Sequence, residues 1–116
     1  MAVDGTAMKN ILSDAYKGSA AYLSAFTAMG SAGSAGTEVS GGSPAYARKA
    51  LSWGSSSGGV VSASQVTFDI PASTTVVGVG VHSAVTAGTY YDKTTVTNQT
   101  FASQGTYGVT ATFTET

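Results

Sequence analysis

Only a few residues of this sequence have types and spacings that could do chemistry, and the first of them is a serine. Residues 54–58 read G-S-S-S-G and match the G-x-S-x-G pattern of a nucleophilic serine in acyl transfer. That chemistry needs a sharp turn from a core strand into a helix. Here the residues that follow, GVVSASQVTF, alternate as a strand does. Because the chain has 15 glycines, such a match arises easily by chance. We therefore expect no catalytic residue at this turn.

His82 is the only histidine, so any histidine-based catalysis would depend on it. It shares one strand face with the glycines of Gly78-Val79-Gly80, which predicts a structural or solvent-facing side chain. That glycine pair lacks the third glycine and the helix of a dinucleotide-binding turn. The six acidic residues are scattered, with none at a metal-ligand spacing from His82, and there is no cysteine. We expect a protein with no catalytic residue, no metal and no cofactor. Loss of a hydrolytic activity in His82→Ala would contradict this.

The aromatic side chains point instead to contacts with other molecules. The chain has six tyrosines and one tryptophan, and amphipathic aromatic residues are favoured in interface cores and at the ends of sandwich strands. We expect Tyr90 or Tyr91 to contact another chain, with packing inside this chain as the alternative. Trp53, Tyr90 and Tyr91 together would also suit a stacking platform for a sugar, which is a different class of function.

Arg48 is the sole arginine and follows Tyr46 by two residues, so in a strand both side chains share a face. This pattern predicts stacking or a carboxylate pair, with Glu38 as the candidate acid. The alternative is a solvated strand charge. Tyr46 and Arg48 join Trp53, Tyr90 and Tyr91 as candidate interface residues.

The elements that must position these side chains begin with a helix of about ten residues. Met8, Ile11, Leu12, Ala15 and Tyr16 lie on one helical stripe, Asp4 or Thr6 suits the N-cap, and Gly18 suits the C′ position. A helix this short is unstable alone in water. We expect it to lie against the domain or a neighbouring subunit.

The remainder of the chain has the alternation of strands, at 21–28, 46–53, 65–70, 77–82, 94–101 and 107–113. Two Gly- and Ser-rich segments, 30–43 and 54–59, are predicted to be flexible loops. The pattern predicts one domain over residues 1–116, with a helical segment at 1–18 and a β domain at 19–116. We expect a mainly β fold, a single β-sandwich or small barrel of about six or seven strands with a short N-terminal helix.

Composition excludes several partners. Five basic residues among 116 cannot form the stripe that phosphate binding requires, so we expect no nucleic-acid binding. No apolar run approaches the roughly 20 residues that span a bilayer, so we expect no membrane partner. The N-terminal MAVDGTAMKN has no apolar region of a secretory signal. Large aliphatic residues are few, and a marginal small domain is commonly completed by oligomerisation, so we expect a homo-oligomer.

Residues 36–54, GTEVSGGSPAYARKALSWG, carry a resemblance to a known family. Their G-T-E-V-S-G-G…Y-A-R segment resembles small bacteriophage proteins of the tail-fibre-like or minor virion structural type. The preceding AAYLSAFTA is similar to the early strand of that family, so the resemblance covers roughly residues 1–70. It implies that Gly41 and Gly42 make a special backbone turn. It also implies that Tyr46 and Arg48 anchor the strand that follows.

The resemblance implies a non-enzymatic virion component, made in the cytoplasm of the bacterial host. Our first hypothesis is a capsid decoration (cement or minor capsid) protein that binds the major capsid protein or other virion proteins as a homotrimer. A fibre generally needs repeats, a coiled coil or a shaft, and the sequence shows none. Many weak copies on a shell suffice through multivalency. The alternative is a tail-fibre or tail-tip component involved in binding a host receptor or glycan.

Overall fold

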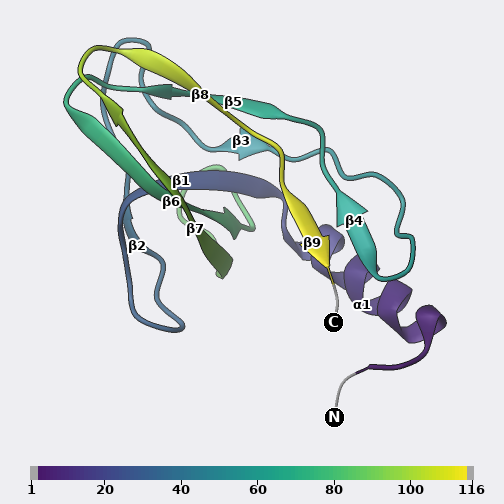
Figure 1. The fold of residues 1–116 in the computed structure, drawn as a ribbon. Coiled ribbons are helices and arrows are strands. Elements are labelled where there is room, and N and C mark those ends of the chain that lie inside the picture. Colours follow the sequence, from purple (N-terminus) through teal and green to yellow (C-terminus); the bar gives the residue numbers. More distant parts are fainter. Residues whose placement is uncertain (1–2, 115–116) are drawn as a thin grey trace.

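The computed structural model describes residues 3–114, which form a mainly β domain with one short helix (Figure 1). The helix is α1 (Thr6–Ser19). The strands are β1 (Tyr22–Met29), β2 (Gly36–Glu38), β3 (Lys49–Ala50), β4 (Val60–Ser62), β5 (Val66–Ile70), β6 (Thr74–His82), β7 (Tyr90–Phe101), β8 (Gly105–Val109) and β9 (Thr112–Thr114). This confirms the predicted fold class. Residues 1, 2, 115 and 116 of the predicted domain lie outside the described residues.

The strands form an open antiparallel sandwich and not a closed barrel. One sheet has the order β2-β1-β6-β7, and β3 pairs with the same strand, β1, as β2 does. The second layer consists of two ribbons, β5–β8 and β4–β9. There are more strands than the expected six or seven because β2, β3 and β4 have only two or three residues each, too few to show an alternation in the sequence.

The core lies between these layers. Leu23 and Ala25 of β1 are buried, together with Val79 and Val81 of the neighbouring β6. Phe68 and Ile70 of β5 are fully buried in the same apolar cluster from the other layer. The alternation predicted for β1 and β5 is therefore the one that fills the sandwich.

The valines of β6 that face this core differ from the predicted ones at an irregularity in the pairing of β6 with β7. The alternation predicts Val77, Val79 and Val81 on one face, but Val76 is the fully buried member of the cluster and Val77 is only half-buried. The register between β6 and β7 shifts between Val76 and Gly78. Val76 pairs with Gln99 and Gly78 pairs with Thr95, so one residue of β6 lies opposite three of β7 and the extra residues are in β7. Val77 does not join the core cluster, so the prediction for Val77 is wrong.

The helix differs from its prediction in length and ends. α1 has 14 residues, its N-cap is Gly5 with no side-chain cap, and it continues through Gly18. The helix ends at Ser19, and the N–H of the C-cap residue Ala20 donates to the Tyr16 carbonyl over 2.8 Å. Of the predicted apolar stripe only Tyr16 packs on the domain, where its ring stacks on Phe113 with centroids 3.8 Å apart.

Two predicted strands are also changed. The predicted strand 46–53 is reduced to β3 and a single bridge between Trp53 and Ala63, because the chain before β3 turns back and Tyr46 N–H bonds to the Gly41 carbonyl. The predicted strand 107–113 is divided into β8 and β9. The division arises because the chain leaves its partner β5 and pairs with β4.

The predicted flexible loop at 30–43 contains β2 and has a specific anchor. The Lys93 ammonium donates to the carbonyls of Gly30, Ser31 and Ser34. Three carbonyls satisfy the three N–H donors of one lysine. The flexibility of this loop and of 54–59 stays a prediction.

Candidate functional site

The residues of the G-T-E-V-S-G-G…Y-A-R segment converge on one carboxylate. Arg48 Nε donates to Glu38 Oε2 over 3.0 Å and Arg48 Nη2 donates to Glu38 Oε1 over 2.9 Å. The Tyr46 hydroxyl donates to the same carboxylate over 2.6 Å and accepts from the Ala25 N–H of β1. We call these three residues, Glu38, Tyr46 and Arg48, the clamp. The predicted pair between Arg48 and Glu38 is confirmed.

The clamp also holds the 83–89 loop. Arg48 Nη1 donates to the Ala84 carbonyl over 3.0 Å and to the Ala87 carbonyl over 2.7 Å. The Arg48 side chain is only 10% exposed. A planar guanidinium has five N–H donors and can bind both oxygens of a carboxylate and two carbonyls at once, whereas a lysine has only three donors for these four acceptors. The clamp thus joins β2, the segment before β3 and the loop between β6 and β7.

The electrostatics of the clamp agree with a structural role. Burial acts to raise the pKa of Glu38, but the hydrogen bonds from Arg48 and Tyr46 and the Arg48 charge outweigh it and lower that pKa. Burial and the bond to Glu38 raise the pKa of Tyr46. These shifts favour a charged Glu38 carboxylate and a neutral Tyr46 hydroxyl, which are the states that their hydrogen bonds need.

The glycine pair that follows β2 makes the predicted special turn. Gly41 has φ of 86° and Gly42 has φ of 98°, both in the left-handed region. The Gln104 side chain makes two hydrogen bonds to this turn. Its Oε1 accepts from Ser43 N–H over 3.2 Å, and its Nε2 donates to the Pro44 carbonyl over 3.2 Å. Three loops therefore meet here, at 40–45, 71–73 and 102–104, and we call them the tip.

We expect Gly42→Ala to lower the free energy of unfolding by about 2 kcal/mol. A Cβ at Gly42 is strained at this φ and would lie 3.1 Å from both the Pro44 carbonyl oxygen and Pro71 Cβ. Gly41→Ala is the control, because its φ is also positive but nothing lies within 4 Å of the added Cβ; it should cost about 1 kcal/mol. Urea unfolding measures both. Equal losses of unfolding free energy in the two variants would show that the contacts around Gly42 leave room for the added Cβ.

His82 is buried and paired with Ser24. Its Nδ1 lies 3.0 Å from Ser24 Oγ, which itself donates to the Gly80 carbonyl over 3.1 Å. Because a hydroxyl has one proton, this leaves Ser24 accepting from the His82 ring. Ser24 is fully buried, so a substrate carbonyl cannot reach this serine–histidine pair. The pair joins β1 to β6 inside the sheet.

We expect stability to fall as the pH is lowered just below 6.5. Burial and the Arg48 charge lower the pKa of His82 from its ordinary value of 6.5, against an opposing effect of Glu38. The unfolded chain therefore binds a proton at a pH where the folded chain does not, so stability increases with pH across this window. His82→Asn should flatten the unfolding free energy between about pH 5 and 7. An unchanged slope of unfolding free energy against pH in this variant would contradict the assignment of this pH dependence to His82. The stability that the Glu38 carboxylate contributes is lost only below its ordinary pKa of 4.5.

The G-x-S-x-G match is not part of a nucleophile turn in this structure. Ser56, in the G-x-S-x-G match, donates to Asp14 of α1 over 2.5 Å, and strand β4 follows instead of the helix that a nucleophile needs. Among residues 3–114, no three His, Cys, Asp or Glu side chains come together as metal ligands. No helix in the described part is long and apolar enough to cross a membrane.

The three aromatic residues of the predicted sugar platform have different surroundings. Tyr90 packs beside His82 with ring centroids 5.7 Å apart. Tyr91, its neighbour in β7, is 48% exposed and borders a groove beside α1. Trp53 is half-buried, and its Nε1 donates to the Ala20 carbonyl over 2.8 Å. No ring contact among residues 3–114 joins two of these three residues, and a sugar platform stays a prediction. Contact of any of the five candidate interface residues with another chain stays a prediction.

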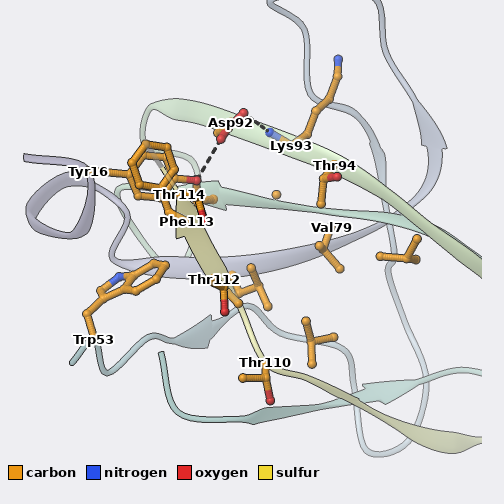
Figure 2. Close-up of a pocket in the computed structure, with 16 residues that line it drawn as sticks. Tyr16, Trp53, Val79, Asp92, Lys93, Thr94, Thr110, Thr112, Phe113 and Thr114 are labelled. Atoms are coloured by element: carbon orange, nitrogen blue, oxygen red, sulfur yellow. Dashed lines mark hydrogen bonds between the residues drawn. The ribbon is translucent and has the colours of Figure 1, made fainter. Parts of the chain in front are cut away.

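An apolar cleft of about 410 Å³ marks where the sandwich stays open, between the large sheet and β9 (Figure 2). Tyr16 and Phe113 stack near it, and Trp53 meets Tyr16 edge to face at 6.0 Å. Tyr16 also donates to Asp92 of β7 over 2.9 Å. These aromatic contacts hold α1 to both layers.

Comparison with known proteins identifies the family. The family model described as Gp80, podophage GP4 fiber I protein gp80, matches residues 7–113. The chain belongs to the gp80 family. This confirms the resemblance seen in residues 1–70 and extends it into β9. The family makes the chain a fibre-type component of a phage virion. Neither a curated protein nor a solved structure matches this chain.

In this gp80-family chain, sequence reasoning found the clamp but missed Gln104 and Lys93. Both side chains bind backbone carbonyls of loops that are distant in sequence, at 60 residues from Pro44 and 63 residues from Gly30. A lone Gln or Lys has no spacing that would reveal such a partner. Only the topology shows it.

Proposed function

We propose that this protein is a non-enzymatic fibre component on the outside of a phage particle that takes part in host binding. The observation that carries the proposal is the two-ended construction of the molecule (Figure 1). Its extents are 47 × 27 × 25 Å, with α1, β4 and β9 at one end and the tip at the other. Such a molecule can be attached by one end and present the other to a target.

The two ends differ in chemistry as this role requires. The α1 end exposes large apolar side chains, with Met8 at 49% and Ile11 at 58% exposure. The tip exposes small neutral residues on a backbone fixed by Gln104. A preformed neutral backbone loop supplies hydrogen-bonding groups to an uncharged ligand such as a glycan without an ordering cost.

The absence of enzymatic activity, cofactor and nucleic-acid partner is part of this proposal. It is supported by the way the chain uses its reactive side chains. The clamp, the Ser24–His82 pair and Lys93 all bind this chain's own atoms. We further propose that the protein is made in the host cytoplasm and assembled onto the particle there.

A capsid decoration protein is the second candidate. One observation favours it: the exposed large apolar side chains of Met8, Ile11 and Leu12 lie on α1, which is at one end of the domain (Figure 1). An end of this kind would also suit attachment to the major capsid protein in many copies, where weak single contacts add up.

Deletion of the gene from a phage that carries it separates the two candidates. For a fibre component we expect adsorption to host cells to fall on the order of 100-fold, while the particles survive heat and osmotic shock as before. Supplying the intact protein in trans is the control and should restore adsorption. Normal adsorption of particles that have become fragile to heat would contradict the fibre role and support decoration.

A further inference from the structure

The two layers of the sandwich differ in width. The first layer has the strands β2-β1-β6-β7 side by side, whereas each ribbon of the second layer, β5–β8 or β4–β9, is two strands wide. Val79 and Val81 of β6 are buried in the core between the layers. Asp92 and Thr94 of β7 lie directly opposite these valines and so share their inner face, yet both are exposed. The second layer therefore ends before it covers β7.

The apolar cleft of about 410 Å³ lies at this uncovered place (Figure 2). Residues 92–94 of β7 line it on one side, and every residue of 109–114 lines it on the other. A strand that turns one face to a cavity lines it with alternate residues only. The unbroken run 109–114 thus borders the cleft with the edge of the strand, where the backbone groups are.

This edge of β9 has backbone groups that are free to pair. The Ala63 N–H donates to the Ala111 carbonyl over 2.9 Å, and Val61 lies opposite Phe113. In an antiparallel pair, the backbone groups of alternate residues point to the partner strand. Those of Thr112, between Ala111 and Phe113, therefore point away from β4. Among residues 3–114, β4 is the only strand that pairs with β9.

We propose that an extended segment of another protein adds to β9 as a further strand of the second layer and closes the cleft. The segment is about six residues long, as the run 109–114 is, and has apolar side chains at every second position. These side chains point to the inner face of β7, while the backbone pairs with β9. Only the identity of the donor as another virion protein rests on the proposed function.

The polar groups on the wall of the cleft favour an uncharged segment. The Asp92 carboxylate already accepts from the Tyr16 hydroxyl over 2.9 Å and from the Lys93 N–H over 2.9 Å. The Lys93 ammonium is bound to carbonyls of the 30–43 loop. A charged side chain entering the cleft would lose its hydration without gaining an ion pair. Apolar and hydroxyl side chains do not carry this cost.

A strand fits this place better than other occupants. A compact apolar molecule would fill the volume but leave the backbone groups of Thr112 covered and without a partner, which is costly. An intact second copy of this chain would have to offer a strand edge of its own. Its long edge strand, β7, has irregular pairing at Tyr91 and at 96–98, and such irregularities hinder pairing between edges. An extended segment outside a folded sheet has neither disadvantage.

The position of the cleft agrees with the two-ended construction of the molecule. Tyr16 of α1 and Phe113 of β9 both line the cleft, and these two elements lie at the end opposite the tip (Figure 1). A strand added here leaves the tip uncovered. The proposal thus gives the attached end a specific means of attachment, through backbone pairing.

A titration of the full, isotope-labelled chain by nuclear magnetic resonance tests the proposal. The probe is a synthetic peptide in which threonine and valine alternate over about six residues, with a terminal lysine at each end for solubility. We expect binding that slows hydrogen exchange of the Thr112 amide. The control is the same peptide with methylated backbone nitrogens, which keeps the side chains but has no N–H donor along the strand. It should bind about 10-fold more weakly or less.

A matched pair of variants places the binding in the cleft. Thr94→Lys puts an ammonium group on the inner face of β7, and we expect it to weaken binding of the alternating peptide about 10-fold. Circular dichroism should stay unchanged because Thr94 is exposed. Thr95→Lys makes the same change at the next residue of β7, which is also exposed but does not line the cleft. It should bind the peptide as the unchanged chain does.

Four results would overturn the proposal. They are no binding of the alternating peptide, equal binding of the methylated peptide, equal loss in the two lysine variants, and a multimer in light scattering that only Thr94→Lys dissociates. The second would indicate an apolar ligand of another kind, and the last would indicate that a second copy covers the cleft. Peptide binding is measured on the isolated chain, so its outcome is independent of the adsorption result.

Discussion

Arg48→Ala is expected to lower the free energy of unfolding by about 3 kcal/mol. The variant leaves the half-buried Glu38 carboxylate without its two guanidinium bonds and the carbonyls of Ala84 and Ala87 without a donor. Three separate segments then lose their common anchor. Urea unfolding monitored by circular dichroism measures the loss, at a pH above 5 where Glu38 is charged in both states.

The matched variants of this experiment separate charge from geometry. Arg48→Lys keeps the charge but has only three donors for the four acceptors that Arg48 binds and lacks its planar fork, so it should recover less than half of the loss. Glu38→Gln combined with Arg48→Ala should cost less than the sum of the single changes, because the two residues act as one unit. A loss below about 1 kcal/mol in Arg48→Ala would show that the pair behaves as a surface ion pair, and the clamp would not be structural.

Gly80→Val is expected to lower the free energy of unfolding by about 3 kcal/mol. A Cβ at Gly80 would lie 2.6 Å from Phe26 Cε2 and 2.8 Å from the Asp92 carbonyl oxygen. Phe26 is 1% exposed and has no room to move. The glycine therefore provides the space into which the Phe26 ring fits across the β1–β6 pair.

Two further variants test this explanation. Gly108→Val makes the same change in β8, where the added carbon would meet the end of the exposed Gln65 side chain, so it should cost little. Phe26→Ala empties the space. The double variant with Gly80→Val should therefore lose about 2 kcal/mol less unfolding free energy than the two single variants lose together. Strict additivity would show that the two residues do not share this space.

The fold class could be predicted because strand alternation is local. β1 and β5 fill the core with the residues that their alternation predicts, and the Glu38–Arg48 pair followed from the scarcity of arginine. The irregular pairing of β6 with β7 could not be predicted, because Val76 and Val77 are chemically identical and only the pairing with β7 distinguishes them.

The orientation of α1 is a second feature that the sequence does not predict. Its apolar stripe was found in the sequence, but periodicity does not say whether the stripe faces the domain or a neighbour. The answer depends on Asn10, Ser13 and Lys17, whose polar groups bind the loop at 54–59 and the helix itself. Such contacts between distant segments carry no pattern in a single sequence.

The central claim is that this gp80-family protein is a fibre component with one attached end and one free end. A cryo-electron microscopy map of intact particles, subtracted from a map of particles lacking the gene, tests it most directly. We predict difference density on the tail apparatus, with the α1 end toward the particle and the tip pointing outward. Difference density spread over the head shell, or α1 pointing away from the particle, would contradict it.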